Sequence, residues 1–79
     1  DEAIRLRPRL ARAYNIRGLA YHQTKDYGRA IADFTKAIEC DPTWAGHFEN
    51  RGLAYRAQGN SSAAEADFRQ AKALSNANK

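Results

Sequence analysis

Histidine and cysteine are the first candidates in this sequence for a metal ligand or a nucleophile. The chain has two histidines, His22 and His47, and one cysteine, Cys40. They are far apart in the sequence, whereas metal sites bring such residues together at short spacing. We therefore expect no metal site, and we expect both histidines at the surface or in a groove.

Carboxylates offer a second route to acid–base chemistry. The candidate pairs are Asp33 with Glu39 and Glu65 with Asp67. Nothing in the sequence positions a substrate between them, and helix charges most often face solvent. No glycine-rich phosphate-binding loop follows a strand-like segment. The sequence assigns no catalytic residue and no cofactor, so we expect that the chain is not an enzyme.

Arginines near the start of the chain could bind phosphate or another acidic group. Arg5, Arg7, Arg9 and Arg12 would form a basic patch for nucleic acid or an acidic partner. Pro8 interrupts this run, and no aromatic residues are interleaved to stack on bases. A solvated face is the favoured interpretation, and a basic surface for nucleic acid or an acidic partner is the alternative.

Composition limits the kind of fold that can position these groups. The 79 residues are 43% hydrophobic and 28% charged with a net charge of +4, which fits one small domain or part of one. No run reaches the roughly 18 apolar residues that a membrane span needs. A single cysteine excludes an internal disulfide and favours a cytoplasmic location. The absence of methionine suggests a segment of a longer chain.

The sequence repeats itself with a period of 34 residues. Residues 11–44 align with residues 45–78 without a gap, and 11 of the 34 positions are identical. The segment RGLAY ends at Tyr21 and again at Tyr55. An apolar stripe from Tyr27 to Ile38 predicts one helix of the first unit, and residues 11–24 predict the other. The period thus predicts stacked helix-turn-helix units.

The positions kept in both units resemble the signature of the tetratricopeptide repeat family, W-x2-L-G-x2-Y followed by A-x3-F and a closing proline. The resemblance implies an all-α solenoid of antiparallel helix pairs in a right-handed superhelix, with about two and a third repeats. It assigns residues 1–10 to the second helix and turn of a preceding repeat, residues 11–44 to one repeat, and residues 45–78 to another with a weak C-terminal cap. The matching residues, which we expect to be structural, are Tyr14, Gly18, Tyr21, Ala30, Phe34, Pro42, Phe48, Gly52, Tyr55, Ala64 and Phe68.

Two arginines depart from this signature, which has leucine at their position. Arg17 and Arg51 each lie 16 residues before an aspartate, Asp33 and Asp67 respectively. We interpret them as two structural ion pairs that join the helices within each repeat. Asn76 replaces the closing proline of the last repeat, which indicates a fraying end.

Local signals predict where the helices begin and how closely they approach. Gly18 and Gly52 lie in the middle of predicted helices, where glycine costs roughly 1 kcal/mol relative to alanine, so we expect close helix crossing there. Trp44, at the junction of the repeats, is either part of the packing or an exposed interaction anchor. The N-cap candidates are Asp26, Thr43 and either Asn60 or Ser61.

The resemblance implies a protein-interaction module whose first helices line a concave groove for a peptide or a partner helix. One subset of the family binds the C-terminal carboxylates of chaperone peptides with a lysine and asparagines. Asn50 matches one of these asparagines, but Asn15 stands in place of the lysine and Leu19 in place of another asparagine. We therefore expect a different ligand. We also expect self-association through exposed repeat ends. Carried over by position, the groove residues are Arg12, Asn15, Ile16, Leu19, His22, Gln23, Glu49, Asn50, Leu53, Arg56 and Ala57.

Overall fold

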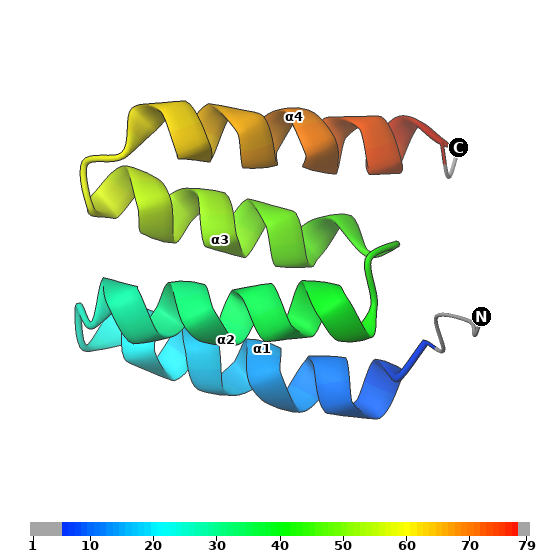
Figure 1. The fold of residues 1–79 in the computed structure, drawn as a ribbon, viewed down its shortest axis with the longest axis horizontal. Coiled ribbons are helices and arrows are strands. Elements are labelled where there is room, and N and C mark those ends of the chain that lie inside the picture. Colours follow the sequence, from blue (N-terminus) through cyan, green and yellow to red (C-terminus); the bar gives the residue numbers. More distant parts are fainter. Residues whose placement is uncertain (1–5, 78–79) are drawn as a thin grey trace.

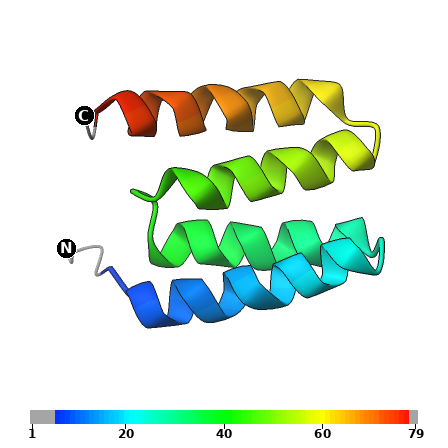
Figure 2. The ribbon, with the colours of Figure 1, turned by 180° about the vertical axis from the view of Figure 1, so that it is seen from behind.

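Four α-helices make up the part of the chain, residues 6–77, that the computed structural model describes. They are α1 (Pro8–Gln23), α2 (Tyr27–Cys40), α3 (Ala45–Ala57) and α4 (Ser61–Ala77). Successive helices are antiparallel, with the α1–α2 and α3–α4 turns at one end of the stack and the α2–α3 connection at the other (Figures 1 and 2). Each helix mainly contacts its neighbours in sequence. The predicted all-α repeat architecture is confirmed.

The first helix begins earlier than the predicted helix over residues 11–24. Pro8 occupies its first turn, where the missing backbone N–H removes no helical hydrogen bond. Residues 8–10 therefore belong to α1 and not to a turn before it, whereas the assignment of residues 1–10 to a preceding repeat stays a prediction. The backbone N–H of Arg7 donates to the carbonyl of Cys40 at 2.8 Å, which joins this start to the end of α2. Residues 1–5, including Arg5 of the predicted basic patch, lie outside the described residues.

Side-chain caps begin two of the helices, as predicted. Asp26 and Asn60 each accept a backbone N–H from the first turn of α2 and α4, at 3.3 and 3.2 Å. The prediction of Thr43 as an N-cap was wrong, because α3 is preceded by Trp44 and has no side-chain cap. The backbone N–H and hydroxyl of Thr43 instead donate to the Asp41 carboxylate, at 3.2 and 2.6 Å. A local Asx turn therefore shapes the α2–α3 connection.

The core consists of small residues packed around few aromatic rings. Phe34 is fully buried between Ala30 of its own helix and Ala54 of α3, and Tyr21 and Ile31 pack against this cluster. Of the signature residues, those that are buried are Gly18, Ala30, Phe34, Phe48, Gly52 and Ala64, and those that are half-buried are Tyr14, Tyr21, Pro42, Tyr55 and Phe68.

A glycine in the first helix of each repeat permits a phenylalanine ring of the second helix to lie directly against its backbone. A Cβ built on Gly18 would lie 2.6 Å from the ring of Phe34, and one built on Gly52 would lie 2.7 Å from the ring of Phe68. These distances are far below carbon–carbon contact, so any larger residue would have to displace a ring. The predicted helix crossing at both glycines is therefore present.

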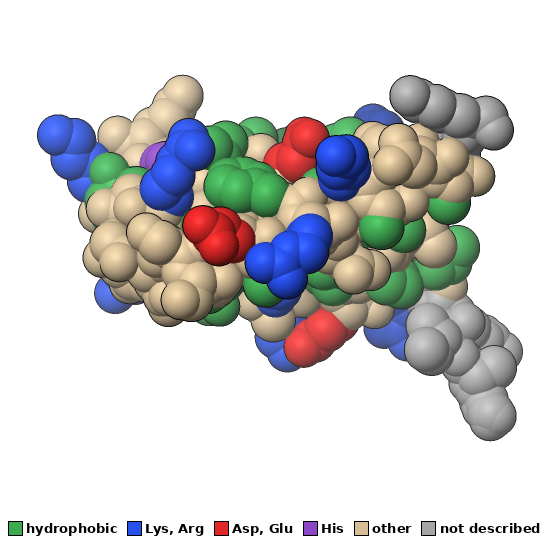
Figure 3. All heavy atoms as spheres, turned by 90° about the horizontal axis from the view of Figure 1, so that it is seen from above, with side chains coloured by type: hydrophobic (Ala, Val, Ile, Leu, Met, Phe, Trp, Pro, Cys, Tyr) green, Lys and Arg blue, Asp and Glu red, His purple; other side chains and the backbone are tan. Residues whose placement is uncertain are grey.

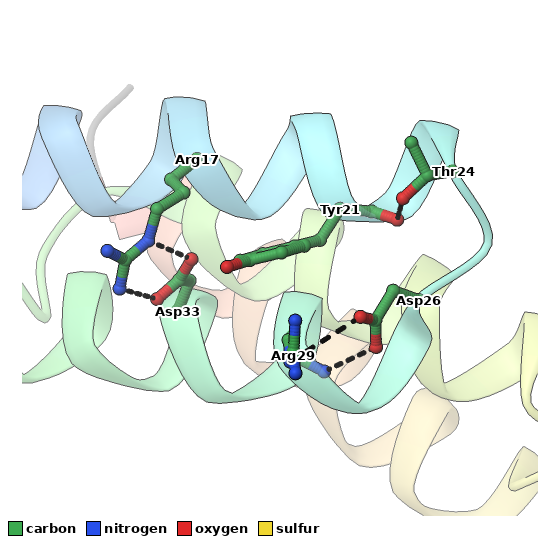
Figure 4. A network of polar contacts seen from close by, with 6 residues as sticks. All are labelled: Arg17, Tyr21, Thr24, Asp26, Arg29 and Asp33. Carbon is green, nitrogen blue, oxygen red and sulfur yellow. Dashed lines mark hydrogen bonds and ion pairs between the residues drawn. The ribbon is translucent and has the colours of Figure 1, made fainter.

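Each repeat contains one bidentate ion pair that joins its two helices. Arg17 donates to both carboxylate oxygens of Asp33, each at 2.8 Å (Figure 4). Arg51 donates to Asp67 with the same two atoms at the same distances. Both aspartates are buried, and the ion-paired hydrogen bonds raise the pKa of each arginine further above its usual range. Arg51 makes a third bond, from Nη1 to the hydroxyl of Thr35 at 3.2 Å.

The α4 end of the stack is polar. Figure 3 looks onto this end, where positive and negative side chains lie among small apolar areas. Glu65, Arg69 and Lys72 of α4 are all exposed, at the positions that Ile31, Thr35 and Ile38 occupy in α2. In the described part of the chain, no helix is long and apolar enough to cross a membrane.

Candidate binding groove

The predicted groove residues lie on α1 and α3, the first helices of the two repeats. Exposed aliphatic side chains stand on both helices: Ile16 is 59% exposed, Leu19 40% and Leu53 38%. Contiguous exposed apolar patches mark surfaces that bind other molecules, and these three are the exposed aliphatic members of the predicted groove set. The remaining exposed members of the predicted set are Arg12, Gln23, Glu49, Arg56 and Ala57.

Two predicted groove residues contact the second helix of their own repeat. The ring of His22 meets the ring of Tyr27 edge to face at 5.3 Å. One period later, the guanidinium of Arg56 lies over the ring of Phe68, 5.4 Å from its centre. Both side chains thus occupy the seam between the helices of one repeat. This leaves Arg12 as the arginine of the predicted set that is not engaged in such a seam.

The side-chain amide of Asn15 joins α1 and α3, the two helices that were predicted to line the groove. Asn15 of α1 is only 7% exposed, and its Oδ1 accepts a hydrogen bond from Nδ2 of Asn50 on α3 at 2.8 Å. The same oxygen lies 3.3 Å from Nδ1 of His47, so Nδ1 carries the proton in this contact. Asn15 and Asn50 are therefore brought together, and the Oδ1 of Asn15 is already engaged in hydrogen bonds within the structure.

His47 is not a surface histidine, although it lines a pocket beside α1. It is 2% exposed, and the edge of its ring meets Trp44 with the ring centres 4.6 Å apart. Burial lowers the pKa of His47, while the nearby negative charge of Asp41 acts in the opposite direction. Sequence reasoning missed this placement because the equivalent position of the first repeat is Ala13, which gives no sign of a polar contact between repeats.

A pocket of about 200 Å³ lies where α1 begins beside the α2–α3 connection. Arg12 and Asp41 give it opposite charges, and Trp44 gives it an aromatic surface that is itself 53% exposed. Trp44 is thus exposed rather than part of the core, and its role as an interaction anchor stays a prediction. The residues that line the pocket are Pro8, Arg12, Asn15, Asp41, Trp44 and His47.

Comparison with protein families matches both repeats of this fold. Residues 11–43 match one model of the tetratricopeptide repeat, and residues 48–78 match a second model of the same repeat. The chain belongs to the tetratricopeptide repeat (TPR) family. A search of curated proteins finds no match.

Among solved structures, this TPR chain is similar to the first TPR domain of Spaghetti (RPAP3), which was solved with the HSP90 peptide SRMEEVD bound. The two chains are 29% identical, with a TM-score of 0.88. The similarity covers 91% of this chain and 57% of the other, so this chain spans little more than half of that one. The repeats and this neighbour together support a protein–protein interaction module.

Proposed function

We propose that this TPR chain binds an extended peptide or a partner helix across α1 and α3 and that it carries out no catalysis. The observation that carries the proposal is the exposed aliphatic group Ile16, Leu19 and Leu53 on neighbouring first helices. Leaving these side chains in water is unfavourable, and a ligand that covers them gains about 25 cal/mol per Å² of apolar surface. Mainly hydrophobic binding surfaces of this kind take specificity from a few polar groups.

The position of Arg12 favours a ligand that carries an acidic residue. It is exposed and lies in the pocket beside Trp44, so an acidic side chain could pair with the guanidinium while its neighbour covers the indole. Such an exposed ion pair is screened by salt. We therefore propose a ligand with aliphatic residues for the centre of the surface and an acidic residue near the start of α1.

The peptide SRMEEVD of the similar RPAP3 domain serves as a defined probe. We expect it to bind this chain weakly, because Leu19 replaces an asparagine of the chaperone-peptide clamp and Asn15 replaces its lysine. Asn15 already accepts hydrogen bonds from Asn50 and His47. Fluorescence anisotropy with labelled SRMEEVD tests this expectation. Tight binding that survives Arg12→Gln would contradict the ligand chemistry proposed here.

Selection from a random peptide library tests the surface itself. Peptides selected on the unmodified chain should lose at least tenfold in affinity for Leu53→Glu, because a carboxylate would then lie in the apolar centre. Ala73→Glu is the matched control, since it adds the same charge at an exposed position of α4. Selected peptides that bind Leu53→Glu as tightly as the control would refute the proposed surface.

A further inference from the structure

Two side chains of opposite charge line the pocket at the start of α1 without pairing with each other. Arg12 reaches the pocket from α1, and Asp41 reaches it from the α2–α3 connection. Of the ion pairs that the described residues form, none joins these two side chains. The walls come from both repeats, so the pocket belongs to the junction between them. A ligand complementary to this pocket carries a negative and a positive group a short distance apart.

Trp44, which also lines the pocket, stands where its side chain does not help the helix that follows. It is the N-cap residue of α3, a position that favours Ser, Thr, Asp or Asn, whose side chains accept a backbone N–H. The indole N–H is only a donor, and α3 has no side-chain cap. More than half of the residue is exposed. Local rules of this kind are broken most often at functional sites, and exposed tryptophan is a typical binding residue.

The ring of Trp44 is held in place although it is exposed. A Cβ built on Gly46 would lie 3.0–3.1 Å from three atoms of the six-membered ring, so the indole lies against the backbone of α3. On another side the ring meets that of His47 edge to face, with the centres 4.6 Å apart. An aromatic side chain that is fixed before binding loses little conformational entropy when a ligand covers it.

The charge that acts near Trp44 is negative. Oδ1 of Asp41 accepts hydrogen bonds from the backbone N–H and the hydroxyl of Thr43, which fix the carboxylate three residues before the indole. A carboxylate has about four acceptor sites, so these bonds leave others for a ligand. The negative charge of Asp41 acts on His47, which packs on Trp44. Burial lowers the pKa of His47, so this imidazole is neutral at pH 7.5 and does not repel a cation.

We propose that the pocket binds an arginine of the ligand, adjacent in the ligand to the acidic residue that pairs with Arg12. The planar guanidinium stacks on the indole of Trp44 and donates hydrogen bonds to Asp41. Pro8 gives an apolar wall for the aliphatic part of this arginine. Lysine fits less well, because its ammonium group cannot stack as a plane. The inference rests on the proposed function, since it names the neighbour of the acidic residue proposed there.

Selection from a random peptide library at pH 7.5 tests this chemistry without a known ligand. On the unmodified chain we expect enrichment of arginine next to an acidic residue. On Asp41→Asn the enrichment of arginine should be lost, whereas acidic and aliphatic residues stay enriched. Asparagine can still accept the hydrogen bonds from Thr43, so this substitution removes the charge and keeps the turn.

The selected sequences separate failure of this inference from failure of the proposed function. Acidic and aliphatic enrichment without arginine on the unmodified chain would overturn the inference and leave the proposed function intact. Peptides that bind Leu53→Glu unchanged would refute the proposed surface, and the inference with it. Arginine enrichment that persists on Asp41→Asn would assign the arginine to another part of the molecule and overturn the inference.

Fluorescence anisotropy with one selected peptide measures the contacts directly. Replacing the peptide arginine by citrulline, which keeps the planar shape and removes the charge, should weaken binding to the unmodified chain about tenfold. The same replacement should have little effect on binding to Asp41→Asn or to Trp44→Asn. Glu65→Gln, at an exposed position of α4, is the matched control and should keep the tenfold difference.

The variant Trp44→Asn removes the indole while giving α3 a residue that can cap it. Circular dichroism verifies that this variant and the others are helical. A tenfold effect of citrulline that is the same on the unmodified chain, Asp41→Asn and Trp44→Asn would overturn the proposal.

Discussion

At Gly18 the backbone of α1 lies directly against the ring of Phe34, and at Gly52 the backbone of α3 lies against Phe68. The two rings differ in freedom, because Phe34 is fully buried and Phe68 is half-buried. Gly28, in the first turn of α2, provides a comparison, because a Cβ added there would have no atom within 4 Å. The same substitution to alanine therefore has different consequences at these three positions.

We expect Gly28→Ala to stabilise the fold by up to about 1 kcal/mol, since alanine loses less backbone entropy in a helix. Gly52→Ala should destabilise the fold, and Gly18→Ala should destabilise it more, by about 1–3 kcal/mol, because Phe34 has no space to move into. Urea unfolding followed by circular dichroism measures all three. Equal stabilisation by all three substitutions would show that the close contacts have no energetic weight.

The two ion pairs have the same geometry but differ in solvent exposure. We expect Arg51→Ala to lower the free energy of unfolding by about 2 kcal/mol, because it leaves Asp67 buried without its partner and also frees Thr35. Arg17→Ala should cost less, since water reaches this guanidinium and screens the pair. Double-mutant cycles with Asp33→Asn and Asp67→Asn measure the two coupling energies. Coupling that is larger for the exposed pair would contradict this ranking.

At the scale of helices, the sequence was sufficient wherever a pattern was local or repeated. The stripe from Tyr27 to Ile38 predicted α2, and the 16-residue spacing predicted the partners of both arginines, because both follow from helix periodicity and repetition. The beginning of α1 was missed because Pro8 can end one helix or start another. The burial of His47 was missed because neither His47 nor its contact residue Asn15 recurs one period away.

The contact between α1 and α3 should make stability depend on pH. Burial holds the pKa of His47 below its ordinary value of 6.5, so between these two values the unfolded chain binds more protons at this residue. The contribution of His47 is therefore fully present above pH 6.5 and declines as the pH falls toward the folded pKa, with a slope of at most about 1.4 kcal/mol per pH unit.

Urea unfolding at pH 7.5 and pH 5.5 checks this dependence. The unmodified chain should lose more stability on acidification than His47→Gln, which keeps an N–H donor for Asn15 but does not titrate. His22→Gln is the control and should behave like the unmodified chain. A pH difference that persists in His47→Gln would assign the effect to other groups.

At the scale of the whole molecule, stability is distributed unevenly along the stack. The α2 helix lies between α1 and α3, whereas α4 contacts α3 alone. In α4 the buried residues are Ala64, Asp67 and Ala71, and within residues 72–77 all are exposed apart from the half-buried Leu74. An element with few buried contacts opens at a lower free energy than the central helices.

Hydrogen exchange followed by NMR should show this gradient. We expect the slowest amide exchange in α2 and faster exchange in α4, with the least protection in the turns after Ala71. Because α4 packs on α3 and not on α1 or α2, we expect its amides to exchange before the molecule unfolds as a whole. Protection in α4 equal to that in α2 would indicate a single cooperative unit.

The amide bridge at Asn15 has a mechanical consequence. The α1 and α3 helices have little direct contact with each other, and their relative position is otherwise transmitted through α2. The hydrogen bonds from Asn50 and His47 to Oδ1 of Asn15 therefore link α1 directly to α3 and resist their separation. A ligand that inserts between the two helices must lengthen or break these hydrogen bonds, whereas a ligand that lies along their surface leaves them intact.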